Sequence, residues 1–238
     1  MKYKENLKII ILALLIVLGT TAFAEALECK KRGFTKDFMI DQCNFSNIGS
    51  NPFFILEPGF QLVLEGKEEG EDVRLEITVL DETETVNGVV TRVVEEIETK
   101  GGELVEVSRN FFAICNETNS VFYHGETTDI YENGEIVSHE GAWRAGEDGA
   151  EPGIIMPGTI LKGARYFQEM APEVAMDRAE IICLDAVLET PYDTFENCLK
   201  TEETTPLEPG AKDFKFYAFG IGLIKDGTLL LTGVTFPP

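Results

Sequence analysis

A series of short glycine-containing turns, set between segments of alternating polarity, restricts the fold of this sequence more than any other feature. From residue 73 to residue 79, apolar residues alternate with polar ones, which is typical of a strand with one face buried and the other in water. Asn87-Gly88 follows this run and precedes the apolar segment 89–97. Both turn residues tolerate positive φ, so the pattern predicts a tight antiparallel hairpin.

The same arrangement recurs along the chain. Further turns are predicted at Lys100-Gly101-Gly102, Asn133-Gly134 and Asp226-Gly227, and further strands at residues 104–114, 129–132, 135–139, 164–169, 178–184, 195–204, 212–218, 222–225 and 228–233. No segment carries a helical apolar stripe of adequate length. The sequence therefore predicts a mainly β, single domain built from a curved antiparallel β-meander, closed as a half-barrel, a barrel or a sandwich, after an N-terminal signal helix.

The N-terminus has the organisation of a cleavable secretory signal. Three lysines precede an apolar run at residues 9–18, and Ala22-Phe23-Ala24 supplies small residues at the cleavage positions. The run is much shorter than the roughly 20 residues of a membrane-spanning helix, which disfavours a retained anchor. A lipoprotein is disfavoured because Glu28, before Cys29, stands where a small residue is needed. We expect a signal peptide at residues 1–24 and an exported protein, extracellular or in the periplasm or cell envelope.

The chain is strongly acidic, with 42 Asp and Glu against 20 Lys and Arg and a formal charge of −22. Such a charge repels nucleic acid and anionic membrane surfaces and attracts metal cations, amines and basic proteins. Because the acids are spread along the chain, a solvated exterior accounts for most of them. We expect neither a nucleic acid nor an anionic lipid surface as partner, and the sequence leaves the oligomeric state open.

All five cysteines follow the predicted cleavage site, where oxidising conditions permit disulfides, and their number is odd. We predict a Cys29–Cys43 disulfide, which would pin an N-terminal segment at residues 25–50 ahead of the β-rich domain at 51–238. The absence of a Cys-x-x-Cys pair argues against zinc. A nucleophilic Cys115 or Cys198 is the alternative to an inert, buried strand cysteine.

Residues 141–163 contain so many glycines and prolines that we expect a long structured loop and no regular strand. It carries Trp143, the only tryptophan, and three acids, Glu147, Asp148 and Glu151. These acids are our candidate metal ligands, with calcium as the possible cofactor, although they lack a full calcium-binding pattern. The alternative is a structural loop whose apolar residues 154–156 plug one end of the sheet.

Five sequence segments carry a resemblance to a known family. They are Asn51-Pro52-Phe53-Phe54-Ile55-Leu56-Glu57-Pro58-Gly59, Val121-Phe122-Tyr123-His124-Gly125-Glu126, Glu140-Gly141-Ala142-Trp143, Pro152-Gly153-Ile154-Ile155-Met156-Pro157 and Tyr217-Ala218-Phe219-Gly220-Ile221-Gly222-Leu223-Ile224. Together they resemble a family of uncharacterised exported prokaryotic β-rich proteins, over roughly residues 51 to 226. Phe219 departs from the family, which usually has proline there. The resemblance implies an exported β domain and assigns no catalytic residue.

Two function classes remain after these exclusions. The first is a non-enzymatic binding or cell-envelope module that presents a concave face to an apolar or small ligand; its candidate binding residues are Phe111, Phe122, Tyr166 and Trp143. The second is an extracellular hydrolase using cross-strand carboxylates, possibly with calcium. A binding module predicts a large apolar pocket without convergent acids, whereas the hydrolase predicts buried acids with shifted pKa values in one cleft. No Gly-x-Ser-x-Gly segment supports a serine nucleophile.

Overall fold

The computed structural model describes residues 33–237, which belong to one compact unit, Gly33–Pro238. Within this range the chain is almost entirely β-structure, with one short 3-10 helix, Ile40–Gln42. The strands are β1 Phe45–Ser46, β2 Gly49–Asn51, β3 Phe54–Leu56, β4 Gln61–Glu68, β5 Glu71–Val86, β6 Val89–Lys100, β7 Glu103–Cys115, β8 Ser120–Glu132, β9 Glu135–Ser138, β10 Trp143–Arg144, β11 Glu151–Met156, β12 Arg165–Phe167, β13 Glu169–Met170, β14 Arg178–Glu189, β15 Thr194–Thr204, β16 Asp213–Ala218, β17 Gly222–Asp226 and β18 Leu229–Thr235. In the described residues, no helix is long and apolar enough to cross a membrane.

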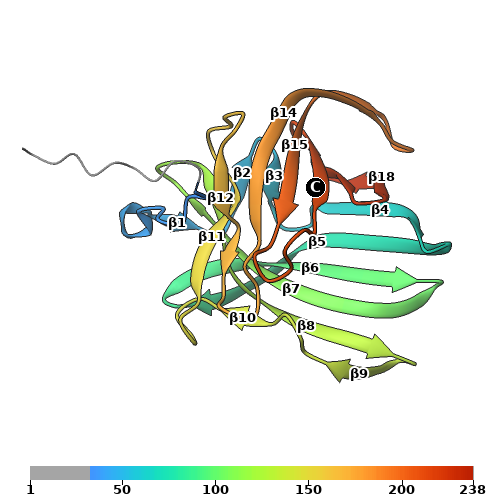
Figure 1. Cartoon of the computed structure of the whole chain (residues 1–238), viewed down its shortest axis with the longest axis horizontal. Helices are drawn as coiled ribbons and strands as arrows, with labels where there is room; N and C mark the ends of the chain where they lie inside the picture. The colour runs from blue at the N-terminus through green and yellow to red at the C-terminus, as the bar shows by residue number, and fades with distance from the viewer. Residues whose placement is uncertain (1–32, 238) are drawn as a thin grey trace, which may run out of the picture. The chain divides into compact units, whose positions relative to one another are not determined.

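Sixteen of these strands form one antiparallel sheet, in which most neighbours along the chain are also neighbours in space. The sheet runs in the order β12-β14-β15-β16-β17-β18-β4-β5-β6-β7-β8-β11-β13. Figure 1 shows β4 to β8 as a fan of long strands, with β14 and β15 arching across it. The glycine turns at residues 87–88, 101–102 and 133–134 join consecutive strands, as the sequence predicts. The last hairpin turns at residues 227–228, one residue later than the predicted Asp226-Gly227, because Asp226 belongs to β17. The mainly β, antiparallel single domain is thus confirmed.

The two ends of the sheet meet, so that the sheet curls into a nearly closed barrel. Its end strands, β12 and β13, are consecutive in the chain and are separated only by Gln168. β11 pairs with both β8 and β13, and β12 pairs with β14. The two ends of the sheet are therefore joined by residues 165–170 of the chain. Within this segment, Gln168 and Glu169 lie at the inner surface of the sheet.

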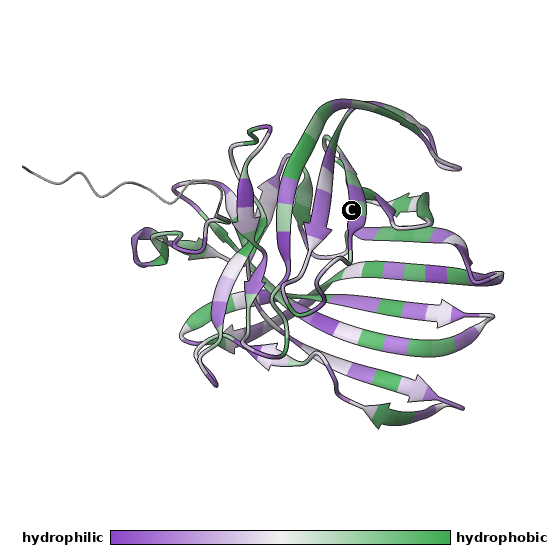
Figure 2. Cartoon of the chain, in the orientation of Figure 1, coloured by the Kyte–Doolittle hydropathy of each residue, from purple (hydrophilic) through white to green (hydrophobic). Residues whose placement is uncertain are grey.

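Alternating polarity along the strands fixes which side chains face inward. Figure 2 shows hydrophobic and hydrophilic residues alternating along the long strands of the sheet. In β4, for example, Leu62 and Leu64 are buried, whereas Glu65 is exposed. Burying fully one such leucine side chain stabilises the fold by about 1.5–3 kcal/mol. The hydrophobic core includes residues from nearly every strand of the sheet.

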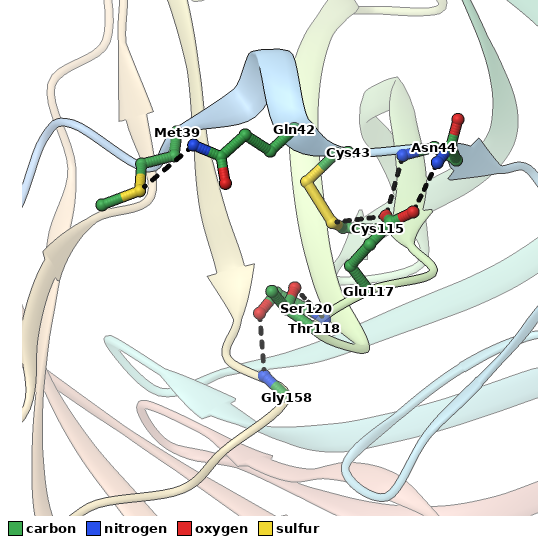
Figure 3. Close-up of a disulfide and its surroundings, with 9 residues drawn as sticks. All are labelled: Met39, Gln42, Cys43, Asn44, Cys115, Glu117, Thr118, Ser120 and Gly158. Atoms are coloured by element: carbon green, nitrogen blue, oxygen red, sulfur yellow. Dashed lines mark hydrogen bonds between the residues drawn. A yellow bond between two sulfur atoms is a disulfide. The ribbon is translucent and has the colours of Figure 1, made fainter.

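The N-terminal segment is held to the sheet by a disulfide other than the predicted one. Cys43 bonds to Cys115, 72 residues away, with a Cα–Cα distance of 5.1 Å (Figure 3). The Cys29–Cys43 prediction is therefore wrong, since one sulfur forms one disulfide bond. The cause is a long-range pairing, because β1 runs antiparallel to the end of β7 with Phe45 opposite Cys115. Cys29 itself, like the predicted signal peptide at 1–24, lies outside the described residues.

The residues on both sides of Cys43 in the chain pack against one surface of β8. The ring of Phe45 lies 5.4 Å from that of Phe122 and 5.1 Å from the His124 imidazole, measured between ring centroids. Phe38 also contacts Phe122, with ring centroids 6.0 Å apart. Residues 33–50 therefore belong to the same packed unit as the domain that the sequence analysis placed at 51–238.

The prediction of a strandless loop at residues 141–163 is wrong. β10 pairs with β8, and β11 pairs with β8 and β13. The misleading residue is Gly153, which makes no turn. A Cβ atom at this position would lie 2.5 Å from the carbonyl oxygen of Gln168 and 2.6 Å from that of Phe167. Glycine here permits two backbones to approach closely inside a strand.

Candidate functional site

The inner surface of the barrel contains a polar cavity of about 370 Å³, which we call the acid cavity. Six carboxylates and one ammonium group line it, together with polar and a few apolar side chains. Its lining residues are Glu96, Glu106, Ser108, Asn110, Phe112, Tyr123, Glu126, Ile155, Gln168, Glu169, Asp177, Glu203 and Lys215. Acidic side chains therefore far outnumber basic ones in this cavity.

Simple strand alternation accounts for most of this lining. On β7 the even-numbered residues from Glu106 to Phe112 all face the cavity, because side chains two apart in a strand share a face. Glu96 on β6 stands opposite Ser108 in the sheet register. The same period brings Lys215 of β16 into the cavity near Glu203 of β15.

An irregularity between β7 and β8 brings two further residues inward. Asn110 pairs with Glu126 and Phe112 pairs with Tyr123, so two steps along β7 match three along β8. Such a bulge re-aims side chains, and it lets Tyr123 and Glu126 both line the cavity although they differ by three positions. Gly125, at the bulge, has φ 140°, and a Cβ there would lie 2.5 Å from the carbonyl oxygen of Trp143.

Burial and crowding of like charges weaken the acidity of the cavity carboxyls. Burial, followed by the nearby acids, raises the pKa of Glu96 and of Glu126 to about 7 and that of Glu169 to about 8. Trp143 Nε1 donates a hydrogen bond to Glu169 Oε2 at 2.9 Å, which opposes part of the rise. At pH 7 Glu96 and Glu126 are therefore about half protonated, and Glu169 is mostly protonated.

One carboxylate of the cavity is held by several donors. Lys215 Nζ lies 3.4 Å from Glu203 Oε2, while Gln168 Nε2 and Thr201 Oγ1 donate to Glu203 Oε1 at 3.1 and 3.3 Å. Although burial acts to lower it, the carboxylates of Glu203 and Asp226 hold the pKa of Lys215 above its ordinary value. Gln168 is 3% exposed, and its Oε1 accepts no hydrogen bond. This Oε1 atom is enclosed by protein and does not open into the cavity.

A smaller apolar pocket of about 90 Å³ adjoins the acid cavity. Glu96, Phe112, Ile155 and Lys215 line both spaces. The other lining residues of the apolar pocket are aromatic or aliphatic apart from one glycine: Phe53, Phe54, Ile55, Phe60, Leu62, Ile77, Val79, Val94, Tyr217, Ile221, Gly222 and Leu223. The inner surface thus offers an electronegative part and an apolar part side by side.

The five segments that carry the family resemblance converge on these two spaces. Residues 53–55 and 221–223 line the apolar pocket, Tyr123 and Glu126 line the acid cavity, and Ile155 lines both. Trp143, from the remaining segment, lines neither space, but its indole N–H donates a hydrogen bond to Glu169, which lines the acid cavity. From these segments the sequence analysis chose only Phe122 and Trp143 as candidate binding residues, and neither lines these two spaces.

Two of the four predicted binding residues are the sequence neighbours of residues that line the cavity. Neither Phe111 nor Phe122 lines the acid cavity or the apolar pocket, whereas their neighbours Phe112 and Tyr123 do. Successive side chains of a strand point to opposite faces, so the predicted pair is one position out of phase. Tyr166 is 4% exposed, and burial followed by the nearby Glu203 raises its pKa.

The predicted metal ligands do not come together. Glu147 and Asp148 line an outer cleft of about 240 Å³ beside Trp143 and Arg144, whereas Glu151 lines a separate space. In residues 33–237, the only three Cys, His, Asp or Glu ligand atoms within 4.8 Å of one another are those of Cys43, Cys115 and Glu117. The two cysteines of that group are bonded to each other in the disulfide, so the group is not a metal centre.

Comparison of the chain with protein-family models, with curated proteins and with solved structures finds no match.

The raised carboxyl pKa values predict that stability falls as pH rises. In the unfolded chain Glu96, Glu126 and Glu169 lose their protons near pH 4.5, whereas the folded chain keeps them until about pH 7 to 8. The stabilisation from these protons is complete below pH 4.5 and lost through pH 8. Between pH 6.5 and 8.5 we expect the free energy of unfolding to fall by about 3.5 kcal/mol, which lowers Tm by about 7–14 °C.

Thermal melts of Glu169→Gln test this prediction, because glutamine stays neutral and the variant should lose about half of the pH dependence. Below pH 6.5 the signal is mixed with that of His124, whose burial lowers its pKa to about 4. That imidazole destabilises the fold as pH falls from 6.5 to 4, which is the opposite direction. An unchanged slope in Glu169→Gln above pH 6.5 would contradict the prediction.

Proposed function

We propose that this chain is an exported, non-enzymatic binding module that holds a small ligand with a polar and an apolar part on its inner surface. The observation that carries the proposal is the adjoining pair of spaces, an acid cavity and an apolar pocket that share four residues. The binding hypothesis drawn from the sequence expected a large apolar pocket without acids. The apolar space is small and the acids converge, so the ligand that fits is polar at one end.

Four observations support the exported, solute-binding character. The N-terminus has the organisation of a secretory signal, and the Cys43–Cys115 disulfide is consistent with an oxidising compartment. The net charge of −22 disfavours nucleic acid and anionic lipid surfaces as partners. The combined size of the two spaces suits a small molecule, since ligand pockets commonly measure about 300–1,000 Å³.

Native mass spectrometry of the purified, exported chain tests the proposal. We expect a small molecule to be retained in the native spectrum and to be absent from the denatured intact mass. Where none is retained, isothermal titration calorimetry with butan-1-ol, which has a polar end and a short apolar chain, replaces it. Leu223→Trp fills the apolar pocket that Leu223 lines, and should weaken binding at least ten-fold.

Leu230→Trp is the matched control, because Leu230 is also a half-buried leucine of a neighbouring strand but lines neither space. It should bind as the unaltered chain does. A chain that retains no ligand and does not bind butan-1-ol would refute the binding proposal, as would equal effects of the two tryptophan substitutions.

A hydrolase using carboxylates is the second candidate, because buried acids with raised pKa values share one cleft. Glu169, with a pKa of about 8, could act as a general acid, and Glu203, which lies beside the Lys215 ammonium, as the second carboxyl group. We rank it second because both oxygens of Glu203 are already engaged, Oε1 by Gln168 and Thr201 and Oε2 by Lys215. Turnover of p-nitrophenyl glycosides or esters that is lost in Glu169→Gln would reverse this order.

A further inference from the structure

A pocket of about 480 Å³ lies on the face of β14 and β15 opposite to the acid cavity, and we call it the arginine pocket. Strand alternation separates the two spaces, because Glu203 lines the acid cavity whereas its neighbours Glu202 and Thr204 line this pocket. The lining residues of the arginine pocket are Phe34, Arg165, Arg178, Glu180, Glu202, Thr204, Thr205, Pro206, Pro209, Gly210, Ala211 and Lys212. None of them lines the acid cavity or the apolar pocket.

The charge of the arginine pocket is the reverse of that of the whole chain. The chain has 42 acidic and 20 basic residues, whereas the lining of this pocket has more bases than acids. Both acids already have a basic partner: Arg165 Nε donates to Glu180 Oε2 at 2.7 Å, and Lys212 Nζ donates to Glu202 Oε1 at 2.7 Å. The positive charge of Arg178 is therefore left without a matching acid in the lining.

The guanidinium group of Arg178 is held in place but keeps two donors free. Its Nε donates to Thr204 Oγ1 at 3.0 Å, and its Cζ lies 4.5 Å from the centroid of the Phe34 ring. Within residues 33–237, its Nη1 and Nη2 form no hydrogen bond or ion pair, and neither atom is enclosed by protein. Both nitrogens are therefore accessible. A planar guanidinium with two N–H groups side by side matches the oxygens of a carboxylate or a phosphate.

Two hydroxyl groups of the same lining can donate as well. Thr204 Oγ1 accepts from Arg178, and Thr205 Oγ1 accepts from the backbone N–H of Leu207 at 3.3 Å. In the described part of the chain, neither hydroxyl donates its own hydrogen to a protein acceptor. Each hydroxyl carries one such hydrogen. The fold therefore leaves donors of both kinds, N–H and O–H, free at one pocket.

We propose that the arginine pocket binds a small oxyanion, a phosphate or carboxylate group, whose oxygens accept hydrogen bonds from Arg178, Thr204 and Thr205. This site is additional to the proposed function and does not depend on it. The net charge of −22 repels an extended polyanion. At physiological salt, charges more than about 8 Å away are largely screened, so a small anion responds mainly to the local charge of the pocket.

Titration of the purified chain with sodium phosphate and with sodium acetate, at constant ionic strength, tests the inference. We expect saturable changes in the amide NMR signals of Thr204, Thr205 and Gly210 with at least one of these anions, and none with chloride. Tighter binding of phosphate assigns the site to a phosphate-bearing ligand, and tighter binding of acetate to a carboxylate. If neither anion gives a saturable change at these residues, the inference is overturned.

A pair of charge-matched variants locates the site. Arg178→Gln should weaken the anion about ten-fold or more, because hydrogen bonds between charged groups are the strong ones. Arg74→Gln removes the same charge from β5, where Arg74 pairs with Glu65 and Glu76 outside the pocket, and should leave the affinity unchanged. Equal losses in the two variants would show that net charge alone attracts the anion, which would overturn the site.

Thr205→Val supplies a second test that leaves the paired strands untouched. Arg178 stands where β14 pairs with the end strand β12, so circular dichroism and a thermal melt establish whether its variant is folded. Thr205 lies in the connection between β15 and β16, and valine keeps its shape without the hydroxyl. We expect Thr205→Val to weaken the anion about three-fold or more. An unchanged affinity in this variant would overturn the proposed role of the Thr205 hydroxyl and, if Arg178→Gln does not fold, the inference itself.

Discussion

Replacing Cys43 and Cys115 together with serine lowers the free energy of unfolding by about 4 kcal/mol. The disulfide closes a loop with a sequence separation of 72 residues, and the loss follows from the greater chain entropy of the unfolded state when that loop is open. For a chain of this size such a loss lowers Tm by about 8–16 °C. Chemical denaturation and thermal melts, each with and without reductant, measure the effect.

Cys183→Ser is the matched control for the disulfide, because Cys183 is a half-exposed free cysteine on β14. Its melting temperature should stay within about 2 °C of the unaltered chain, since surface substitutions change stability by about 0.5 kcal/mol. An unaltered chain that melts at the same temperature in oxidising and reducing buffer would contradict the assigned stabilising role of the Cys43–Cys115 bond.

Turn chemistry and strand period account for the parts of the fold that the sequence predicts. Asn87-Gly88 joins β5 to β6, and Asn133-Gly134 joins β8 to β9, because these dipeptides accept positive φ at both positions. Alternating polarity in residues 73–79 predicts the β5 face that packs inward. Both signals are local, so a single sequence is enough to find them.

The errors arise where distant segments decide the outcome. Cys43 pairs with Cys115 because β1 lies against the end of β7, and no local pattern reveals that contact. Gly153 looks like a turn residue, but it serves the close approach of β11 to the chain at Gln168. Both the disulfide pairing and the close backbone contact at Gly153 depend on how the sheet closes. The sequence left a half-barrel, a barrel and a sandwich as alternatives.

The candidate site also combines features that local sequence patterns predict with features that depend on distant segments. Glu202 and Glu203 are neighbours, and strand alternation correctly implies that only one of them faces inward; Glu203 lines the cavity, while Glu202 pairs with Lys212 at the surface. The gathering of Glu203 with Glu126 and Glu169 needs three strands far apart in the chain. The bulge that turns Tyr123 inward also escapes sequence reading, because an extra residue in one strand shifts the phase of alternation.

The closure of the sheet at Gln168 makes Gly153 the position where one methyl group should alter both stability and binding. A Cβ at Gly153 would meet the carbonyl oxygens of Gln168 at 2.5 Å and of Phe167 at 2.6 Å. These are backbone atoms, so no side-chain rotation relieves the clash, and β11 must separate from the segment that holds Gln168 and Glu169. We expect Gly153→Ala to lower the free energy of unfolding by about 3 kcal/mol.

Gly233→Ala is the control, because a Cβ on this β18 glycine lies in ordinary contact with Val63, 3.6 Å away. It should change stability by no more than about 1 kcal/mol. At a temperature where both variants are folded, Gly153→Ala should also bind butan-1-ol more weakly than Gly233→Ala, since displacement of the segment that holds Gln168 and Glu169 changes the shape of the cavity. Equal melting temperatures for the two variants would show that β11 and the end strands separate at little cost, in which case closure through Gln168 does not fix the geometry of the acids.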